Sequence, residues 1–194
     1  MISPNPSVTF LNSFSGISEE ILEELRKVSK FKKIKSGKQL VKLNEVPSKV
    51  YMLLSGVVRC YLITESGKEF NKNFYLPIGF VGPLTALIKK KPSLFVFEAL
   101  SDCEVYEINY NKLIDLCKIN QSVNMLYSKV LEAVYVIYER RLIELLSLDA
   151  KGRYMALRKR IPEVDELIPQ YHIASYLGIT PVQLSRIRKK MDAY

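Results

Sequence analysis

The sequence is poor in the side chains on which metal centres depend. It contains one histidine, His172, and three widely spaced cysteines, Cys60, Cys103 and Cys117, with no CxxC pair among them. An odd, unclustered set of cysteines is typical of reduced thiols rather than of a disulfide framework. Zinc sites and iron–sulfur clusters need closely spaced ligands, which this sequence lacks. We therefore expect no metal site and no disulfide.

Catalytic arrangements are missing as well. A Ser–His–Asp or Cys–His site cannot be assembled around a single histidine that lies in a basic C-terminal segment. No glycine-rich phosphate loop follows a strand pattern. The carboxylates are scattered and do not pair in apolar surroundings that would tune them for acid–base chemistry. The sequence predicts that the protein is not an enzyme.

Long apolar runs are also absent. The uncharged stretch Asn73–Ile88 has 16 residues and is interrupted by two prolines and two glycines. It is too short and too broken to cross a bilayer core of ~30 Å. The N-terminus lacks the basic and apolar regions of a signal peptide. We therefore expect a soluble, cytoplasmic protein with no membrane partner.

What the sequence does have is an excess of positive charge. Its 194 residues carry a formal charge of +9, and 48% of them are hydrophobic, which is ample for a packed core. Residues 148–194 hold 9 Lys and Arg against 5 Asp and Glu, a net +4; residues 1–147 hold 20 against 15, a net +5. The charge density is therefore higher in the last quarter of the chain, which suits a polyanionic partner.

The segment Gln170–Lys190 has the pattern of a helix-turn-helix unit. Ala174 is followed four residues later by Gly178, and the apolar residues Leu184 and Ile187 stand six and nine positions beyond the glycine. The alanine is small because the two helices of such a unit nearly touch there. The unit binds DNA by placing its second helix in the major groove.

The residues between the two helices support this prediction. Gly178 can adopt the positive φ that ends a helix sharply. Thr180 can cap the second helix, and Pro181 is suited to its first turn. An ordinary corner of two helices remains the alternative, although such a corner needs no basic second helix without acidic residues.

The first half of the chain reads as a β-structure preceded by one short helix, from Ser18 to about Ser29. Short apolar or alternating runs separated by turn residues predict an antiparallel barrel or sandwich. The runs are Phe31–Lys35, Gln39–Leu43, Val50–Leu54, Val57–Thr64, Glu69–Leu76, Phe95–Leu100 and Glu104–Ile108.

Helices follow at Tyr110–Cys117, at Gln121–Leu146 and, after a cap by Asp149, at Ala150–Lys159. The long helix carries apolar residues at alternating spacings of four and three, which is the spacing of a coiled-coil seam. The seam consists of Val123, Tyr127, Val130, Val134 and Ile137, with Arg141 as its one charged member. A second apolar stripe beside it favours pairing with a twofold copy of the chain. A single broad face on one core is the alternative.

This arrangement resembles the Crp/Fnr family of transcription regulators over nearly the whole chain. The matching segments are Ser36–Lys38, Val50–Val58, Gly67–Glu69, Cys103–Val105 and Pro169–Lys189, the last in the form common in the Bacteroidetes branch.

The resemblance implies an α+β fold in three parts. Residues 1–119 would form an antiparallel, jelly-roll-like β-roll of cyclic-nucleotide-binding type. Residues 120–147 would form a long dimerisation helix. Residues 148–194 would form a winged-helix-like helix-turn-helix domain that binds DNA.

The family's nucleotide-binding residues are only partly present. The family holds the nucleotide phosphate with a helix that opens Phe-Gly-Glu and with an arginine further along. Here Gly82 is followed by Pro83 instead of glutamate, Ser93 stands in place of the arginine, and Leu94 in place of a hydroxyl residue. A buried phosphate without the arginine would be poorly paired. We therefore expect that cyclic AMP is not bound in the family's usual way.

Other effectors of the family can be compared with the sequence in the same way. No cysteine cluster is present for an iron–sulfur sensor, and the β-region has no histidine to bind haem. The expected pocket is apolar and fits a small organic ligand or no ligand. Its residues are Phe80, Gly82, Leu84, Thr85, Ser93, Phe95 and Tyr138.

The sequence thus predicts a homodimeric DNA-binding transcription regulator that responds to an unidentified effector. Its two recognition helices would read a pseudo-palindromic operator with half-sites ~34 Å apart. By the resemblance, Arg186 reads a base, and RNA polymerase is a further partner. Val182 and Gln183 are also placed to meet bases. Thr180, Ser185, Arg188 and Lys189 are expected at phosphates, and His172 at a phosphate or in solvent.

Two other functions remain open at this point. The chain could be a cyclic-nucleotide or small-molecule binding module with a secondary or lost role at DNA. It could also be a protein–protein module that uses the long helix, with the basic end serving only solubility.

Overall fold

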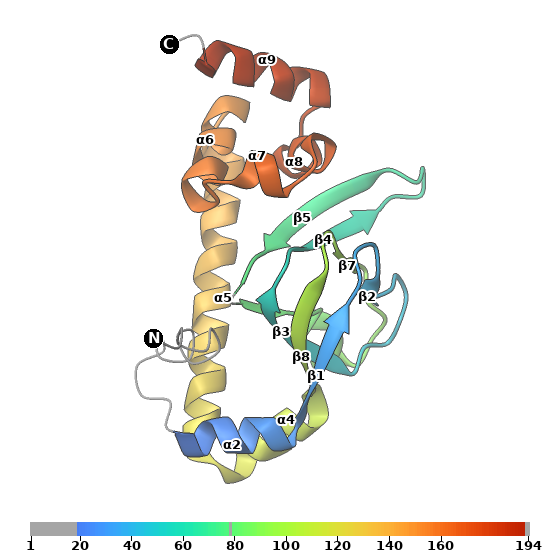
Figure 1. Cartoon of the computed structure of the whole chain (residues 1–194), viewed down its shortest axis with the longest axis vertical. Coiled ribbons are helices and arrows are strands. Elements are labelled where there is room, and N and C mark those ends of the chain that lie inside the picture. The colour runs from blue at the N-terminus through green and yellow to red at the C-terminus, as the bar shows by residue number, and fades with distance from the viewer. Residues whose placement is uncertain (1–18, 78, 193–194) are drawn as a thin grey trace. The chain divides into compact units, whose positions relative to one another are not determined.

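The computed structural model describes residues 19–77 and 79–192 (Figure 1). Ser18, where the first helix is expected to begin, lies outside these residues. The chain divides into two compact units, one made of residues up to 60 with 74–133, and the other of residues 61–73 with 134 onward. The boundary passes through the long helix α5 (Gln121–Ser147), which contributes to both units.

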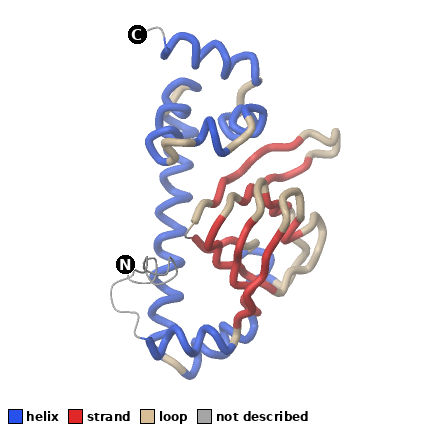
Figure 2. The backbone as a smooth tube through the Cα atoms, in the orientation of Figure 1, coloured by secondary structure: helices blue, strands red, loops and turns tan. Residues whose placement is uncertain are grey.

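In the described part of the chain, eight strands form two four-stranded sheets, drawn in red in Figure 2. The first sheet has the order β1 (Ser29–Ile34), β8 (Cys103–Asn109), β3 (Lys49–Ser55), β6 (Gly79–Val81). The second has the order β2 (Gln39–Val41), β7 (Val96–Ala99), β4 (Val58–Ile63), β5 (Glu69–Tyr75). The seven expected strands are confirmed. The sequence did not predict β6, because three residues that begin with glycine carry no alternating pattern.

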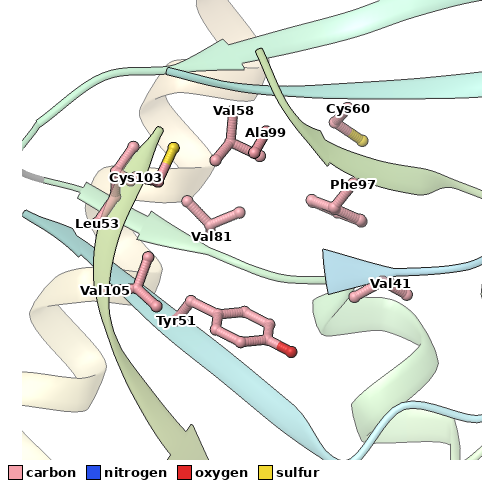
Figure 3. Packing of buried hydrophobic residues seen from close by; sticks show 10 residues of the cluster. All are labelled: Val41, Tyr51, Leu53, Val58, Cys60, Val81, Phe97, Ala99, Cys103 and Val105. Atoms are coloured by element: carbon pink, nitrogen blue, oxygen red, sulfur yellow. The ribbon is translucent and has the colours of Figure 1, made fainter. Parts of the chain in front are cut away.

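The central strands of the first sheet, β3 and β8, have covered residues on both faces, and the alternation of side chains along them decides which residue faces which way. Leu53 on β3 stands opposite Val105 on β8, and both belong to the apolar cluster shown in Figure 3. The preceding residue, Met52, stands opposite Tyr106 and packs on the other face of the sheet. Strand β3 therefore reads as an almost continuous apolar run, from Val50 to Leu54.

Helices cover the second face of this sheet. Their apolar residues form a second cluster, to which α2 (Glu19–Lys27) contributes Ile21, α4 (Tyr110–Ile119) contributes Leu113, and α5 contributes Val123. Val123 is only 1% exposed. The first residue of the expected dimer seam is therefore covered within its own chain. A further short helix, α3 (Leu84–Lys89), follows β6.

The second unit is built from helices around a compact apolar core. They are α6 (Ala150–Arg160), α7 (Val164–Leu167), α8 (Gln170–Leu177) and α9 (Pro181–Asp192). Tyr154, Ile173 and Leu184 are completely buried. Asp149 caps α6 by accepting a hydrogen bond from the N–H of Gly152, as expected. The winged part of the expected fold is not found, because the described residues after Asn109 contain no strand that could form a wing.

A buried charge cluster ties the end of α5 to the other helices of this unit. The Glu144 side chain is 8% exposed, and its two carboxylate oxygens accept hydrogen bonds from Arg160, at 3.1 Å, and Arg141, at 3.4 Å. Arg160 also donates to the Tyr176 hydroxyl at 2.7 Å, and the Arg141 guanidinium lies 3.8 Å from the centre of the Tyr176 ring. Burial raises the pKa of Tyr176. Arg141 is therefore not a charged member of a dimer seam, as the spacing indicated, but binds α8.

Two glycines with similar backbone angles provide a matched test of packing in the roll. Gly56 and Gly37 have φ of +87° and +78°. A Cβ on Gly56 would overlap the Asp102 carbonyl oxygen and lie 2.6 Å from the Cys103 Sγ, whereas one on Gly37 would meet nothing within 4 Å. We expect Gly37→Ala to lower the free energy of unfolding by about 1 kcal/mol and Gly56→Ala by about 3 kcal/mol. Urea denaturation of both variants measures the difference, and equal losses would contradict it.

The charge cluster predicts an unequal response of two glutamates on α5. In Glu144→Ala, the largely buried Arg141 and the more exposed Arg160 both lose their carboxylate partner, so we expect a loss of about 3 kcal/mol in unfolding free energy. Glu132→Ala on the same helix is the control; its side chain is exposed, and we expect a change within about 0.5 kcal/mol. Thermal or chemical denaturation gives both values. A Glu144→Ala protein as stable as the control variant would show that the cluster does not stabilise the unit.

Candidate DNA interface and effector domain

The turn between α8 and α9 has the geometry that its sequence predicts. Gly178 has φ +70° and ends α8 in the left-handed conformation. Its N–H donates to the Ser175 carbonyl, and the N–H of Ile179 donates to the Ala174 carbonyl at 3.0 Å. These two bonds close the helix as a Schellman motif. Ala174 is completely buried, as expected for the point where the two helices meet.

Thr180 and Gln183 begin the second helix as a reciprocal capping box. The Thr180 hydroxyl accepts from the N–H of Gln183 at 3.2 Å, and the Gln183 side-chain oxygen accepts from the N–H of Thr180 at 2.9 Å. This pair satisfies two N–H groups that have no partner within the helix. Thr180 is confirmed as the cap. Because the carboxamide oxygen of Gln183 is used at the cap, only its NH₂ group remains to contact a base.

Helix α9 has one buried side and one exposed side. Leu184 is completely buried, and Ser185, Ile187 and Arg188 are partly covered. The opposite side is exposed and contains no acidic residue within the helix up to Met191. Its exposed residues are Val182, Gln183, Arg186, Lys189 and Lys190.

Arg188 differs from the other cations of α9 because an acidic residue lies beside it. Its guanidinium is 3.7 Å from one oxygen of Asp165, and the other oxygen accepts a hydrogen bond from the Tyr154 hydroxyl at 2.6 Å. Burial, followed by this hydrogen bond, raises the pKa of Tyr154 to about 12. Arg188 thus connects α9 to α7 and is less available to DNA than Arg186.

His172 is not at the surface, contrary to the expectation from sequence. It is 4% exposed, and its Nδ1 lies 3.3 Å from the side-chain nitrogen of Asn71, which is 6% exposed. The same Asn71 nitrogen donates to the His172 carbonyl at 3.2 Å. A buried side chain in these contacts does not reach a DNA phosphate. Sequence reasoning missed this partner because Asn71 is 101 residues away along the chain.

The hairpin of β4 and β5 therefore packs on α8, the first helix of the helix-turn-helix, within the second unit. The Ser175 hydroxyl donates to the Glu69 carbonyl at 2.9 Å and accepts from the Asn71 N–H at 3.0 Å. A cavity of about 330 Å³ lies beside this contact. It is lined by Lys68, Glu69 and Phe70 of the hairpin and by Tyr171, Ser175, Gly178, Ile179, Thr180, Pro181 and Gln183 of the helical part. Tyr171, which sequence reasoning did not select, is 59% exposed near the beginning of α8.

In the effector domain, the residue that replaces the family's arginine does not face a ligand. Ser93 is 1% exposed, and its hydroxyl donates to the Phe95 carbonyl at 2.8 Å and accepts from the Phe95 N–H at 3.2 Å. Leu94 is 72% exposed. Neither side chain supplies charge or a free hydroxyl to a phosphate. A Cβ on Gly82 would come 3.2 Å from a methyl carbon of Val50, so this glycine serves close packing.

The other expected pocket residues have differing surroundings. Phe95 packs against the interior cluster, whereas Phe80 packs against the cluster on the helix side of the first sheet. Leu84 is half-buried and Thr85 is exposed. Tyr138 belongs to the second unit, where the Lys72 ammonium lies 4.9 Å from the centre of its ring. The structure thus does not gather Phe80 and Phe95 against one cluster.

A buried arginine does exist in the roll, but it is paired and points away from the interior cluster. Arg59 donates to Glu98 at 3.1 Å. The neighbours Val58 and Cys60, and likewise Phe97 and Ala99, belong to the interior cluster. Because side chains alternate along a strand, Arg59 and Glu98 lie on the opposite face. Arg59 therefore does not replace the missing phosphate-binding arginine inside the roll.

Within residues 19–77 and 79–192, no group of three or more His, Cys, Asp and Glu side chains is arranged to hold a metal ion. In the same part of the chain, no helix is both long and apolar enough to cross a membrane.

Known proteins show the same organisation. Residues 31–120 match the family model for the cyclic nucleotide-binding domain. The "Anaerobic regulatory protein" of Haemophilus influenzae is 29% identical, over 88% of this chain and 70% of that protein. The structure of FixK2 from Bradyrhizobium japonicum is 19% identical, with a TM-score of 0.72, and the match covers 86% of this chain and 85% of that one.

A regulator from Eubacterium rectale, assigned to the Crp/Fnr family, has a similar structure as well. It is 12% identical, with a TM-score of 0.70, and the match covers 91% of this chain and 84% of that one. The two solved structures establish the fold, and the sequence relatives are regulatory proteins that match most of this chain. Residues 31–120 match a domain of cyclic-nucleotide-binding type, and over most of its length the chain is similar to transcription regulators of the Crp/Fnr type.

Proposed function

We propose that this regulator binds an operator as a homodimer and reads it with the exposed side of α9. The observation that carries the proposal is the two-sided character of this helix. Leu184 is buried in the unit, whereas Val182, Arg186 and Lys189, spaced by four and three residues, stand on the exposed side. Residues at this spacing share one face of a helix. A basic face at the end of a helix-turn-helix fits the major groove.

The exposed residues differ in what they can read. Arg186 can form the bidentate pair with guanine that is the commonest specific contact in DNA recognition. Lys189 and Lys190 are point charges near the end of the helix and suit phosphates, which fix register rather than sequence. Ser185 and Tyr171 would contact the DNA backbone beside them. Thr180, Gln183 and Arg188 contribute mainly by shaping the helix, because their polar groups already have partners within the protein.

The second half of α5 supports the dimer. Large apolar side chains are exposed along it, at 66% for Tyr135, 55% for Leu142 and 79% for Leu146. Val136, Ile137, Tyr138, Ile143 and Leu145 are exposed as well. Contiguous apolar surface of this kind marks an interaction site. We propose that a second copy covers it, which would set two recognition helices for half-sites ~34 Å apart. RNA polymerase as a partner and a cytoplasmic location are suggested by the family resemblance alone, and both stay predictions.

We further propose that the effector, where one acts, is not a cyclic nucleotide held in the family's usual way. The surroundings of Ser93 and Arg59 support this, because neither presents a free polar group to a phosphate inside the roll. A small apolar ligand remains the better candidate. An effector would act by favouring the arrangement in which both recognition helices reach their half-sites.

Two substitutions on α9 test the proposed readout. Arg186→Ala should lower affinity for the preferred operator about 10- to 100-fold and relax base preference, because a bidentate base contact is lost. Lys189→Ala should weaken binding to all DNA sequences nearly equally, and it should reduce the salt dependence of binding by about one released counterion. Gel shifts at several salt concentrations measure both effects. If wild type and Arg186→Ala both bind every DNA fragment weakly and with equal affinity, the result would favour a module whose role at DNA is secondary or lost.

Calorimetry tests the effector site directly. Cyclic AMP and cyclic GMP titrated into the full-length protein should give no binding in the micromolar range, because the phosphate would lack a cationic partner in the roll. Adenosine 5′-monophosphate serves as a control for non-specific heat. Micromolar binding of either cyclic nucleotide, with no comparable signal from the control, would mean that other residues hold the phosphate.

A further inference from the structure

Val182 occupies an unusual place for an apolar side chain. It is 60% exposed, although it lies in the first turn of α9, next to the residues that close the capping box. Its neighbours Thr180, Pro181 and Gln183 line the cavity beside the hairpin, but Val182 is not among the lining residues. It shares the exposed side with Arg186, one helical turn further on. A single exposed valine is common on protein surfaces, so its position on the recognition helix is what matters.

The N-terminal residues of a recognition helix are those that meet base edges in the major groove. An isopropyl group cannot make a hydrogen bond there. The apolar group that the major groove offers is the 5-methyl group of thymine, and apolar side chains contact it. Val182 and Arg186 are ~6 Å apart along the helix axis, which corresponds to about two base steps of ~3.4 Å. Both can therefore contact bases of the same half-site.

We propose that Val182 is a specificity-determining residue that reads a thymine methyl group within about two base pairs of the guanine contacted by Arg186. This inference rests on the proposed function, since it assumes that α9 enters the major groove. It adds to that function the identity of a base and the single group on it that is recognised. It also predicts that the half-site contains one required thymine that the protein recognises through its methyl group and not through a hydrogen bond.

The experiment removes that methyl group and nothing else. The full-length protein first selects its operator from random-sequence DNA. Each thymine of the selected half-site is then replaced, one at a time, by deoxyuridine, which keeps every hydrogen-bonding group of thymine. We expect one position at which the wild type binds roughly three- to tenfold more weakly, the effect of losing about one buried methyl group.

Variants assign the effect to the side chain. Val182→Ser should bind thymine and deoxyuridine operators equally at that position. Lys189→Ala, the control, should bind both more weakly but keep the full thymine preference. Val182→Glu should change the preference there toward cytosine, whose amino group donates to a carboxylate. Because Val182 is exposed, these variants are expected to fold, and circular dichroism spectra can confirm it.

The outcomes separate this inference from the proposed function. In one outcome, an operator is enriched, but deoxyuridine changes the affinity of wild type and of Val182→Ser equally at every position. That result would overturn the role of Val182 and leave the proposed function intact. Failure to enrich any DNA sequence would overturn the proposed function and, with it, this inference.

Discussion

The carboxylate of Glu144 is the point from which the helical unit is organised. Two arginines from different helices donate to its two oxygens, and the same arginines hold the ring and the hydroxyl of Tyr176 on α8. An ion pair buried to this degree is stabilising only when every partner is in place. The orientation of α8, and through its turn of α9, is thereby fixed relative to the end of α5.

The turn itself depends on local chemistry. Gly178 supplies the left-handed residue, the Schellman bonds close α8, and Thr180 and Gln183 cap α9 reciprocally. These interactions join residues at most five positions apart. They set the angle between the two helices before any long-range packing is considered. Polar residues predicted to contact DNA, such as Gln183, therefore already form hydrogen bonds within the protein.

The packing of the roll follows from the pattern of its own strands. The interior cluster and the helix-covered face both follow from alternation on β3 and β8, and neither needs a ligand. Ser93 satisfies its hydroxyl against the adjacent backbone, where a relative would carry a cation. The match to a cyclic nucleotide-binding domain therefore describes the architecture of residues 31–120 more firmly than what they bind.

The sequence by itself determined the features that rest on local pattern. Seven strands, the long helix, the cap by Asp149 and the helix-turn-helix with Ala174 and Gly178 follow from alternation, helical spacing and turn residues, which involve neighbours along the chain. The three-residue strand β6 carries too short a pattern to be recognised. Tertiary structure alone decided which polar residues are free. Arg141 has the spacing of a dimer seam but contacts Tyr176. His172 lies in the first helix of the helix-turn-helix but contacts Asn71, 101 residues earlier. Partners so distant in sequence leave no periodic signal, because only the folded chain brings them within hydrogen-bonding distance.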